Sequence, residues 1–265
     1  MIPGSLWLVG CGNMGGAMLG RWIGEGLDPA TITVIDPGAP MVPQGVSVRA
    51  DLPAGPAPEV LVLAIKPQHL ADFSAGLAAW QGRAPQVLSI LAGVDAATIS
   101  ARLRATDVVR AMPNLPVGIG KGVVALFSDA ADSALRARVE ALSRPLGHVE
   151  WIDEECLFDA VTALSGSGPG FLFRFIDSLA AAGEAIGLPG GLSARLALAT
   201  VEGAAILAAQ STLSPAALAD RVASKGGSTR EGLNVLDADS ELTELLTQTL
   251  AAARRRNAEL ADQNS

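Results

Sequence analysis

The stretch Gly10-Cys11-Gly12-Asn13-Met14-Gly15 decides the fold of this chain. It matches the pattern G-x-G-x-x-G, and it lies between an apolar run at residues 6–10 and an amphipathic stretch at residues 13–25. In such a strand–turn–helix unit the first glycine permits the tight turn, the second lets the backbone approach a pyrophosphate, and the third permits close helix–strand packing. The phosphates lie at the positive N-terminus of the helix. The stretch therefore predicts a dinucleotide site that includes Gly10, Gly12, Asn13, Met14 and Gly15.

The rest of the N-terminal half continues the alternation of strands and helices. Further strands are predicted at residues 31–35, 60–65, 87–91, 108–112, 123–127 and 149–152. Helices are predicted between them, including one that runs to about Trp80 and others at residues 96–103 and 133–142. Alternating strands and helices indicate βαβ units, so we expect an α/β fold with a Rossmann-like, doubly wound, mostly parallel sheet.

After about Asp153 the strand patterns end and only helices are predicted. Their ranges are 157–164, 169–186, 192–209, 215–222, 229–236 and 240–260, with Ser214 as the N-cap before Pro215. We therefore expect a dinucleotide-binding domain over residues 1–153 and an all-α substrate and dimerisation domain over residues 154–265. These helices are too apolar for a small domain that is solvated on every side, which favours a subunit interface.

Composition excludes several classes of protein. The chain has 265 residues and a net charge of −8, and this acidic balance without a basic stripe argues against nucleic-acid binding. We expect no membrane segment, because charges interrupt the apolar stretches, and the N-terminus lacks the charged region of a signal peptide. The two cysteines, Cys11 and Cys156, form no disulfide framework or thiolate metal site, so we expect a cytoplasmic protein without a metal.

Acid–base catalysts are scarce. The chain has no Tyr and two His, and Lys66, Lys121 and Lys225 are its three lysines. Mechanisms that need a Tyr–Lys proton-donor pair are therefore excluded. His69 and His148 have no catalytic or metal-ligand partner in the sequence pattern, which favours structural roles.

Asp36 follows the second predicted strand, where an acidic residue can bind the adenine-ribose 2′-hydroxyl. A carboxylate there repels the 2′-phosphate of NADP, so Asp36 favours NADH over NADPH. Asp36-Pro37 is equally typical of a turn, and this second interpretation stays open.

Other candidate cofactor residues follow predicted strands, at the edge where open α/β sheets bind ligands. Pro113 is also explained as a strand terminator. The candidates are Ala64, Lys66, Pro67, Ala92, Gly93 and Pro113.

Six motifs occur in order along nearly the whole chain. They are Gly10-Cys11-Gly12-Asn13-Met14-Gly15, Ala64-Ile65-Lys66-Pro67, Leu91-Ala92-Gly93-Val94, Arg110-Ala111-Met112-Pro113-Asn114, Ser165-Gly166-Ser167-Gly168-Pro169 and Val222-Ala223-Ser224-Lys225-Gly226-Gly227-Ser228-Thr229. Together they resemble the motifs of pyrroline-5-carboxylate reductases, which make proline by reducing a cyclic imine. The resemblance implies NADH or NADPH as cofactor, a small imine as substrate, and an intertwined dimer or higher homo-oligomer formed through the C-terminal helices.

The last motif carries the substrate-site expectations. The resemblance places Thr229 at the ring nitrogen of the imine, as the catalytic residue. Backbone amides of Gly226, Gly227 and Ser228 precede a predicted helix and suit a substrate carboxylate. Lys225 stands where the family usually has Pro and adds a cation. An ordinary helix cap made by Ser228 is the alternative.

The resemblance also places Ser167 near the substrate, whereas the start of a helix is the alternative for that segment. Two further residues depart from the family pattern, Leu115 and Phe171, and these departures leave a different cyclic imine open as substrate.

The chemistry agrees with the scarcity of acid–base groups. An imine that enters as an iminium ion needs a hydride and a positioned hydroxyl rather than a strong acid. A β-hydroxyacid dehydrogenase needs a lysine near the start of the interdomain helix, and none occurs between Lys121 and Lys225. A regulatory protein that only senses the cofactor needs neither Thr229 nor its Gly-Gly loop.

Overall fold

The computed structural model describes residues 3–53, 55–77 and 85–262. The chain forms two compact units, Met1–Ser167 with Ala253–Ser265, and Gly168–Ala252. Residues 154–167 belong to the first unit because Phe158, which is 3% exposed, packs into its core and meets Phe127 edge to face at 6.4 Å.

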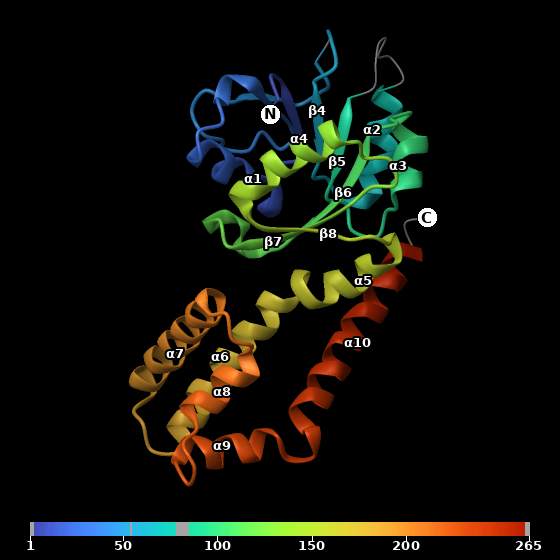
Figure 1. Cartoon of the computed structure of the whole chain (residues 1–265). Helices are drawn as coiled ribbons and strands as arrows, with labels where there is room; N and C mark the ends of the chain where they lie inside the picture. Colours follow the sequence, from blue (N-terminus) through green and yellow to red (C-terminus); the bar gives the residue numbers. More distant parts are fainter. Residues whose placement is uncertain (1–2, 54, 78–84, 263–265) are drawn as a thin grey trace. The chain divides into compact units, whose positions relative to one another are not determined.

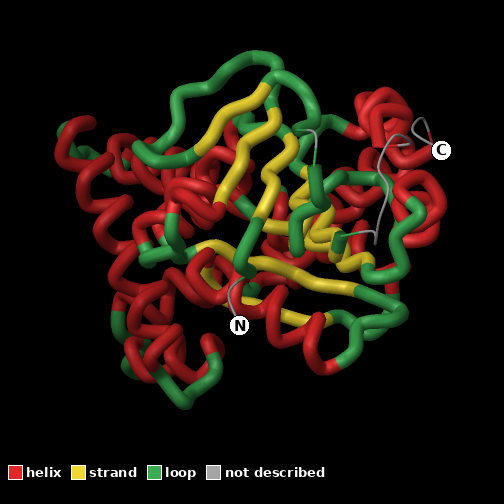
Figure 2. Tube along the Cα trace, turned by 90° about the horizontal axis from the view of Figure 1, so that it is seen from above, coloured by secondary structure: helices red, strands yellow, loops and turns green. Residues whose placement is uncertain are grey.

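The first unit is built on one eight-stranded sheet with the order β3-β2-β1-β4-β5-β6-β7-β8. All neighbouring strands are parallel except β6 and β7, which are antiparallel. The strands are β1 (Leu6–Val9), β2 (Ile32–Ile35), β3 (Ser47–Arg49), β4 (Val60–Leu63), β5 (Gln86–Ser89), β6 (Val108–Pro113), β7 (Gly122–Phe127) and β8 (Gly147–Trp151). Figure 2 shows the strands fanning out across this twisted sheet. The predicted Rossmann-like sheet is confirmed, and β3 is an additional strand.

Helices cover both faces of the sheet. Successive residues of β1 point to opposite faces, so that Leu6 and Leu8 enter one core cluster while Trp7 and Val9 enter the other. Helices α1 (Asn13–Gly24) and α4 (Ser133–Ser143) cover the first cluster, and α2 (Leu70–Leu77) and α3 (Ala96–Leu103) cover the second (Figure 1). The continuation of the second helix to Trp80 lies outside the described residues.

The second unit is helical, as expected. It contains α6 (Gly168–Ala185), α7 (Gly190–Gln210), α8 (Pro215–Val222), α9 (Ser228–Leu236) and most of α10 (Glu241–Asp262), and α5 (Phe158–Val161) precedes it in the first unit. Ser214 caps α8 as predicted, because its Oγ accepts a hydrogen bond of 3.2 Å from the amide of Ala217. Ser193 of α7 donates to the carbonyl of Ala180 in α6 at 2.6 Å, which joins the two long helices.

Helix α7 bears on the expectation of no membrane segment. Among the described helices it has the length and apolar composition needed to cross a membrane, although it carries Arg195 and Glu202. A single such helix is weak evidence for a membrane protein.

Candidate active site

The glycine loop has the geometry that its motif predicts. Gly10 follows β1 with φ +88°, and a Cβ there would lie 2.6 Å from the carbonyl oxygen of Ala64. A Cβ on Gly15 would lie 2.5 Å from the carbonyl oxygen of Gly10. The strand ends and α1 therefore approach each other only because both positions are glycine.

Gly12 is different, because no heavy atom beyond Gly12 and its two chain neighbours lies within 4 Å of the place where its Cβ would be. It occupies the N-cap position of α1, where no side chain caps the helix, and Asn13 and Met14 begin the helix. The first amides of α1 are thus free to bind an anion, and the open space beside Gly12 admits one closely. The loop fits a dinucleotide pyrophosphate.

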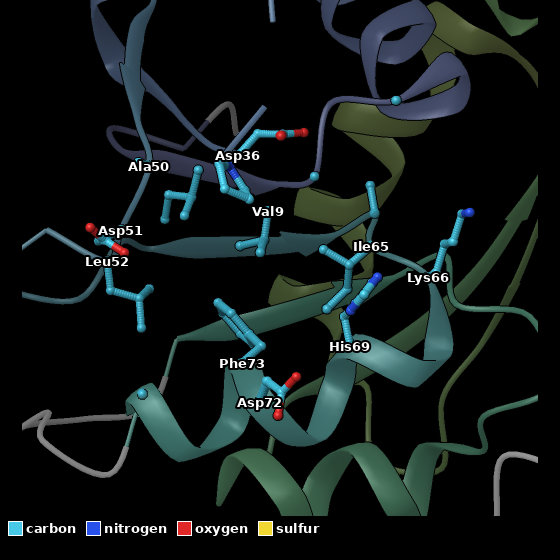
Figure 3. Close-up of a pocket in the computed structure, with 16 residues that line it drawn as sticks. Val9, Asp36, Ala50, Asp51, Leu52, Ile65, Lys66, His69, Asp72 and Phe73 are labelled. Carbon is cyan, nitrogen blue, oxygen red and sulfur yellow. The ribbon is translucent and has the colours of Figure 1, made fainter. Parts of the chain in front are cut away.

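A cavity of about 700 Å³ opens beside this loop (Figure 3). The segments that line it include those at the carboxyl ends of β1, β2, β3 and β4, at the edge where ligands bind in open α/β sheets. It brings together five of the residues predicted from the sequence, namely Gly10, Gly12, Asp36, Ala64 and Lys66.

Part of the cavity wall was not predicted from the sequence. His69 and Phe73 lie on successive turns of one segment, and both side chains point into the cavity in Figure 3. Asp51, Leu52 and Asp72 also line it. His69 and Phe73 are spaced i, i+4 just after a predicted strand, which places both side chains on one face of a helix and could have indicated this wall.

Asp36 makes a turn and also lies in the cavity wall. Its Oδ1 accepts from the amide of Gly38 at 2.8 Å, which is the turn interpretation. Its Oδ2 accepts from the amide of Cys11 at 2.7 Å and so ties the end of β2 to the glycine loop. The carboxylate also lines the cavity. Burial, and secondarily the charge of Asp36, raise the pKa of the Cys11 thiol, which keeps it neutral.

The remaining strand-end candidates are distributed along the sheet edge. Pro67 begins a short 3-10 turn after β4, and Pro113 is the last residue of β6. Ala92 and Gly93 follow β5 and line a separate cavity of about 30 Å³ with Met112.

An ion pair that the sequence analysis did not single out shapes this small cavity. Arg110 is 7% exposed, donates to Glu155 Oε1 at 2.7 Å, and lies 4.2 Å from the ring centre of Phe158. The same Glu155 oxygen accepts from the amide of Ala96 at 2.8 Å. The pair therefore fastens the start of α3 and the segment before α5 to β6.

The proposed substrate loop lies in the second unit, between α8 and α9. Gly226 has φ +73°, and the amide of Gly227 donates to the carbonyl of Ser224 at 3.0 Å. Gly227, not Ser228, occupies the N-cap position of α9, so the alternative of a Ser228 cap is wrong. Lys225 and Thr229 are exposed. Because no side chain caps α9, its first amides are available to an anion.

Ser167 lies at a junction between helices. A π-helical turn spans Thr162–Gly166, the amide of Ser167 donates to the carbonyl of Thr162 at 2.9 Å, and α6 begins at Gly168. This segment therefore leads directly into the start of a helix, which was the alternative considered for it. Ser167 belongs to the first unit and the loop at Gly226–Thr229 to the second.

Comparison with known proteins gives matches over nearly the whole chain. Residues 155–260 match the family model for pyrroline-5-carboxylate reductase dimerisation, and residues 5–93 match the model for NADP oxidoreductase, coenzyme F420-dependent. The pyrroline-5-carboxylate reductase of Pseudomonas aeruginosa is 35% identical over 263 residues, which cover 96% of each chain.

Solved structures agree with these matches. A pyrroline-5-carboxylate reductase from Coxiella burnetii is 30% identical, with a TM-score of 0.88 over 97% of this chain and 98% of that one. A pyrroline carboxylate reductase from Plasmodium falciparum, solved with NADP bound, shares the fold at 23% identity with a TM-score of 0.77 over 97% and 98% of the two chains. With the glycine loop and its cavity, these matches show that the chain belongs to the pyrroline-5-carboxylate reductase family.

Proposed function

We propose that this chain transfers a hydride from a reduced nicotinamide cofactor to the C=N bond of pyrroline-5-carboxylate, giving L-proline in the last step of proline biosynthesis. The full-length match to the family carries this proposal, and the uncapped glycine loop beside the 700 Å³ cavity supports it. Oxidation of NADH or NADPH in the presence of pyrroline-5-carboxylate tests it.

The chain's own residues position rather than activate the substrate. The bound nicotinamide supplies the hydride. The free amides at the start of α1 hold the pyrophosphate. The amides of Gly226 and Ser228 bind the substrate carboxylate, while Gly227 shapes the loop through its hydrogen bond to the carbonyl of Ser224. The Thr229 hydroxyl accepts a hydrogen bond from the N–H of the already protonated imine and orients the ring, so that hydride addition at carbon gives the neutral secondary amine without a further proton transfer. Ala92, Gly93 and Pro113 line the nicotinamide side of the site, and Ser167 the substrate side.

The charges in the cavity favour NADH. Asp36, Asp51 and Asp72 line it, and Lys66 and His69 are the basic side chains among its described lining residues. Asp36 at the end of β2 accepts from the 2′-hydroxyl of the adenine ribose and repels a 2′-phosphate. The related Plasmodium protein holds NADP, so the family fold by itself accommodates the phosphorylated cofactor.

Asp36→Asn is expected to raise the ratio of kcat/KM for NADPH over NADH about tenfold, because it removes a negative charge near the 2′-position. The amide side chain keeps one oxygen as an acceptor for the backbone amides of Cys11 or Gly38. Steady-state kinetics with both cofactors measure the ratio. Asp129→Asn, a change at an exposed carboxylate outside the cavity, is the control. An unchanged ratio in Asp36→Asn would assign Asp36 to the turn alone.

Lys225→Ala is expected to raise KM for pyrroline-5-carboxylate about threefold to tenfold at low salt, because the lysine attracts the substrate carboxylate. The effect should shrink as salt is added, since Lys225 is exposed to solvent. Lys121→Ala, a change at an exposed lysine of the first unit, serves as the matched control. Equal KM values in Lys225→Ala and the unmodified chain at low salt would remove Lys225 from the substrate site.

We expect the helical unit to mediate self-association of the chain. The match to the dimerisation model supports homo-oligomerisation, and we assign the contact to the C-terminal helices. Helices α6 and α7 expose large apolar side chains in the single chain, including Leu172, Phe173, Phe175, Leu196, Ile206 and Leu207. Covering this surface in a dimer accounts for the apolar character of α7 in a soluble cytoplasmic enzyme.

A further inference from the structure

One carbonyl group in the helix junction lacks its ordinary α-helical donor. In an α-helix the carbonyl of Ser165 would accept from the amide of residue 169, but residue 169 is proline and has no N–H. In the π-helical turn that ends at Gly166, the amide of Ser167 donates to the carbonyl of Thr162 and so gives no hydrogen bond to Ser165. The Ser165 carbonyl therefore needs a donor from elsewhere, because a buried unpaired carbonyl is costly.

Asn114 supplies that donor from the sheet. Its Nδ2 donates to the carbonyl of Ser165 at 2.9 Å, and its Oδ1 accepts from the amide of Val123 at 2.8 Å. The two partners fix the orientation of the amide, because the reverse orientation would pair donor with donor and acceptor with acceptor. Asn114 is 6% exposed, so these hydrogen bonds are shielded from water.

Asn114 also has a fixed backbone. Its amide donates to the carbonyl of Val123 at 3.1 Å, directly after Pro113 ends β6. One side chain thus couples the end of β6, where the proposed nicotinamide residue Pro113 lies, to the segment that ends in Ser167. Both ends of the coupling belong to the first unit.

We propose that Asn114 is a positioning residue for the reduction, which holds the Ser165–Ser167 segment in register with the end of β6. This inference rests on the proposed function for its kinetic consequences only. It makes Asn114 and Pro169 a matched pair: the proline removes the helix donor, and the asparagine replaces it. Restoring an N–H at position 169 should therefore lessen the need for Asn114.

The test is a double-mutant cycle of Asn114→Ala and Pro169→Ala in the full-length chain. Asn114→Ala is expected to lower kcat with pyrroline-5-carboxylate about tenfold and to leave the Kd for NADH within about twofold, because the glycine loop is not touched. In the Pro169→Ala background the same change should lower kcat less than about threefold. Melting curves confirm that each variant is folded before kinetics are compared. A kcat unchanged in Asn114→Ala, or an equal loss in both backgrounds, would overturn the inference.

Hydrogen exchange separates this inference from the proposed function. Loss of Asn114 should speed exchange of the Ser167 amide about tenfold, and Pro169→Ala should restore part of the protection, whatever the substrate is. Absence of turnover with pyrroline-5-carboxylate in the unmodified chain would count against the function, whereas unchanged exchange at Ser167 would count against the role of Asn114. A third variant, Asn114→Asp, keeps the acceptor for Val123 and removes the donor, so it should resemble Asn114→Ala at neutral pH and recover activity as acid protonates the introduced carboxyl.

Discussion

Replacing Thr229 by alanine is expected to lower kcat with pyrroline-5-carboxylate about a hundredfold, while the Kd for NADH stays within about twofold. The side chain is exposed at the start of α9, beside the amides that we assign to the substrate carboxylate. Its hydroxyl is the group proposed to contact the ring nitrogen, and the chain offers few other acid–base groups to replace it.

Two further variants make the Thr229 result specific. Thr229→Ser keeps the hydroxyl and should retain most of the turnover. Thr212→Ala, a change at an exposed threonine of the same unit, should behave like the unmodified chain. A Thr229→Ala protein with full kcat would show that this residue is only part of the loop.

Replacing Gly12 by valine is expected to weaken NADH binding about a hundredfold or more without lowering the Tm. The Cβ of the new side chain meets no heavy atom within 4 Å beyond its own residue and the two chain neighbours, and the φ of −72° at this position is open to any residue. The branched side chain therefore extends into the space that the pyrophosphate needs, and its Cβ meets no neighbouring element of the folded protein. Fluorescence titration with NADH and a melting curve measure the two effects.

Two other glycines provide the controls for Gly12→Val. Gly20→Val, at an exposed position of α1 with equally open space, should change neither NADH binding nor Tm appreciably. Gly15→Ala should lower the Tm, because its Cβ would meet the carbonyl oxygen of Gly10 at 2.5 Å. Normal NADH affinity in Gly12→Val would contradict the assignment of this loop to the cofactor.

The strands and helices were predictable where a pattern extended over enough residues. Strands β1 and β4 are continuous apolar runs, and helix α8 has a clear start in Ser214 before Pro215. Strand β3, Ser47–Arg49, was missed because three mostly exposed residues carry no periodicity. The antiparallel pairing of β6 with β7 was also missed, although residues 114–121 between them are too few for a helical crossover.

The candidate site was predictable where backbone geometry dictates the residue. Gly10 and Gly15 are required by contacts within one turn and the adjacent strand, so the motif alone indicates them. Leu52 lines the cavity because distant segments meet there, and nothing near it in the sequence marks that meeting. For His69 and Phe73 the sequence offers only their i, i+4 spacing. The partnership of Asn114 with Ser165 likewise depends on tertiary structure, although Pro169 marks in the sequence the carbonyl that needs it.

Oxidation of the reduced cofactor by the purified full-length chain tests the central claim most directly. The assay compares NADH with NADPH, and pyrroline-5-carboxylate with a six-membered cyclic imine, and it measures the proline formed. We expect oxidation of NADH with pyrroline-5-carboxylate, with one proline formed for each cofactor oxidised, a lower kcat/KM with NADPH, and slower turnover of the larger ring. No oxidation of either cofactor with either imine would contradict the assignment of this chain as an imine reductase.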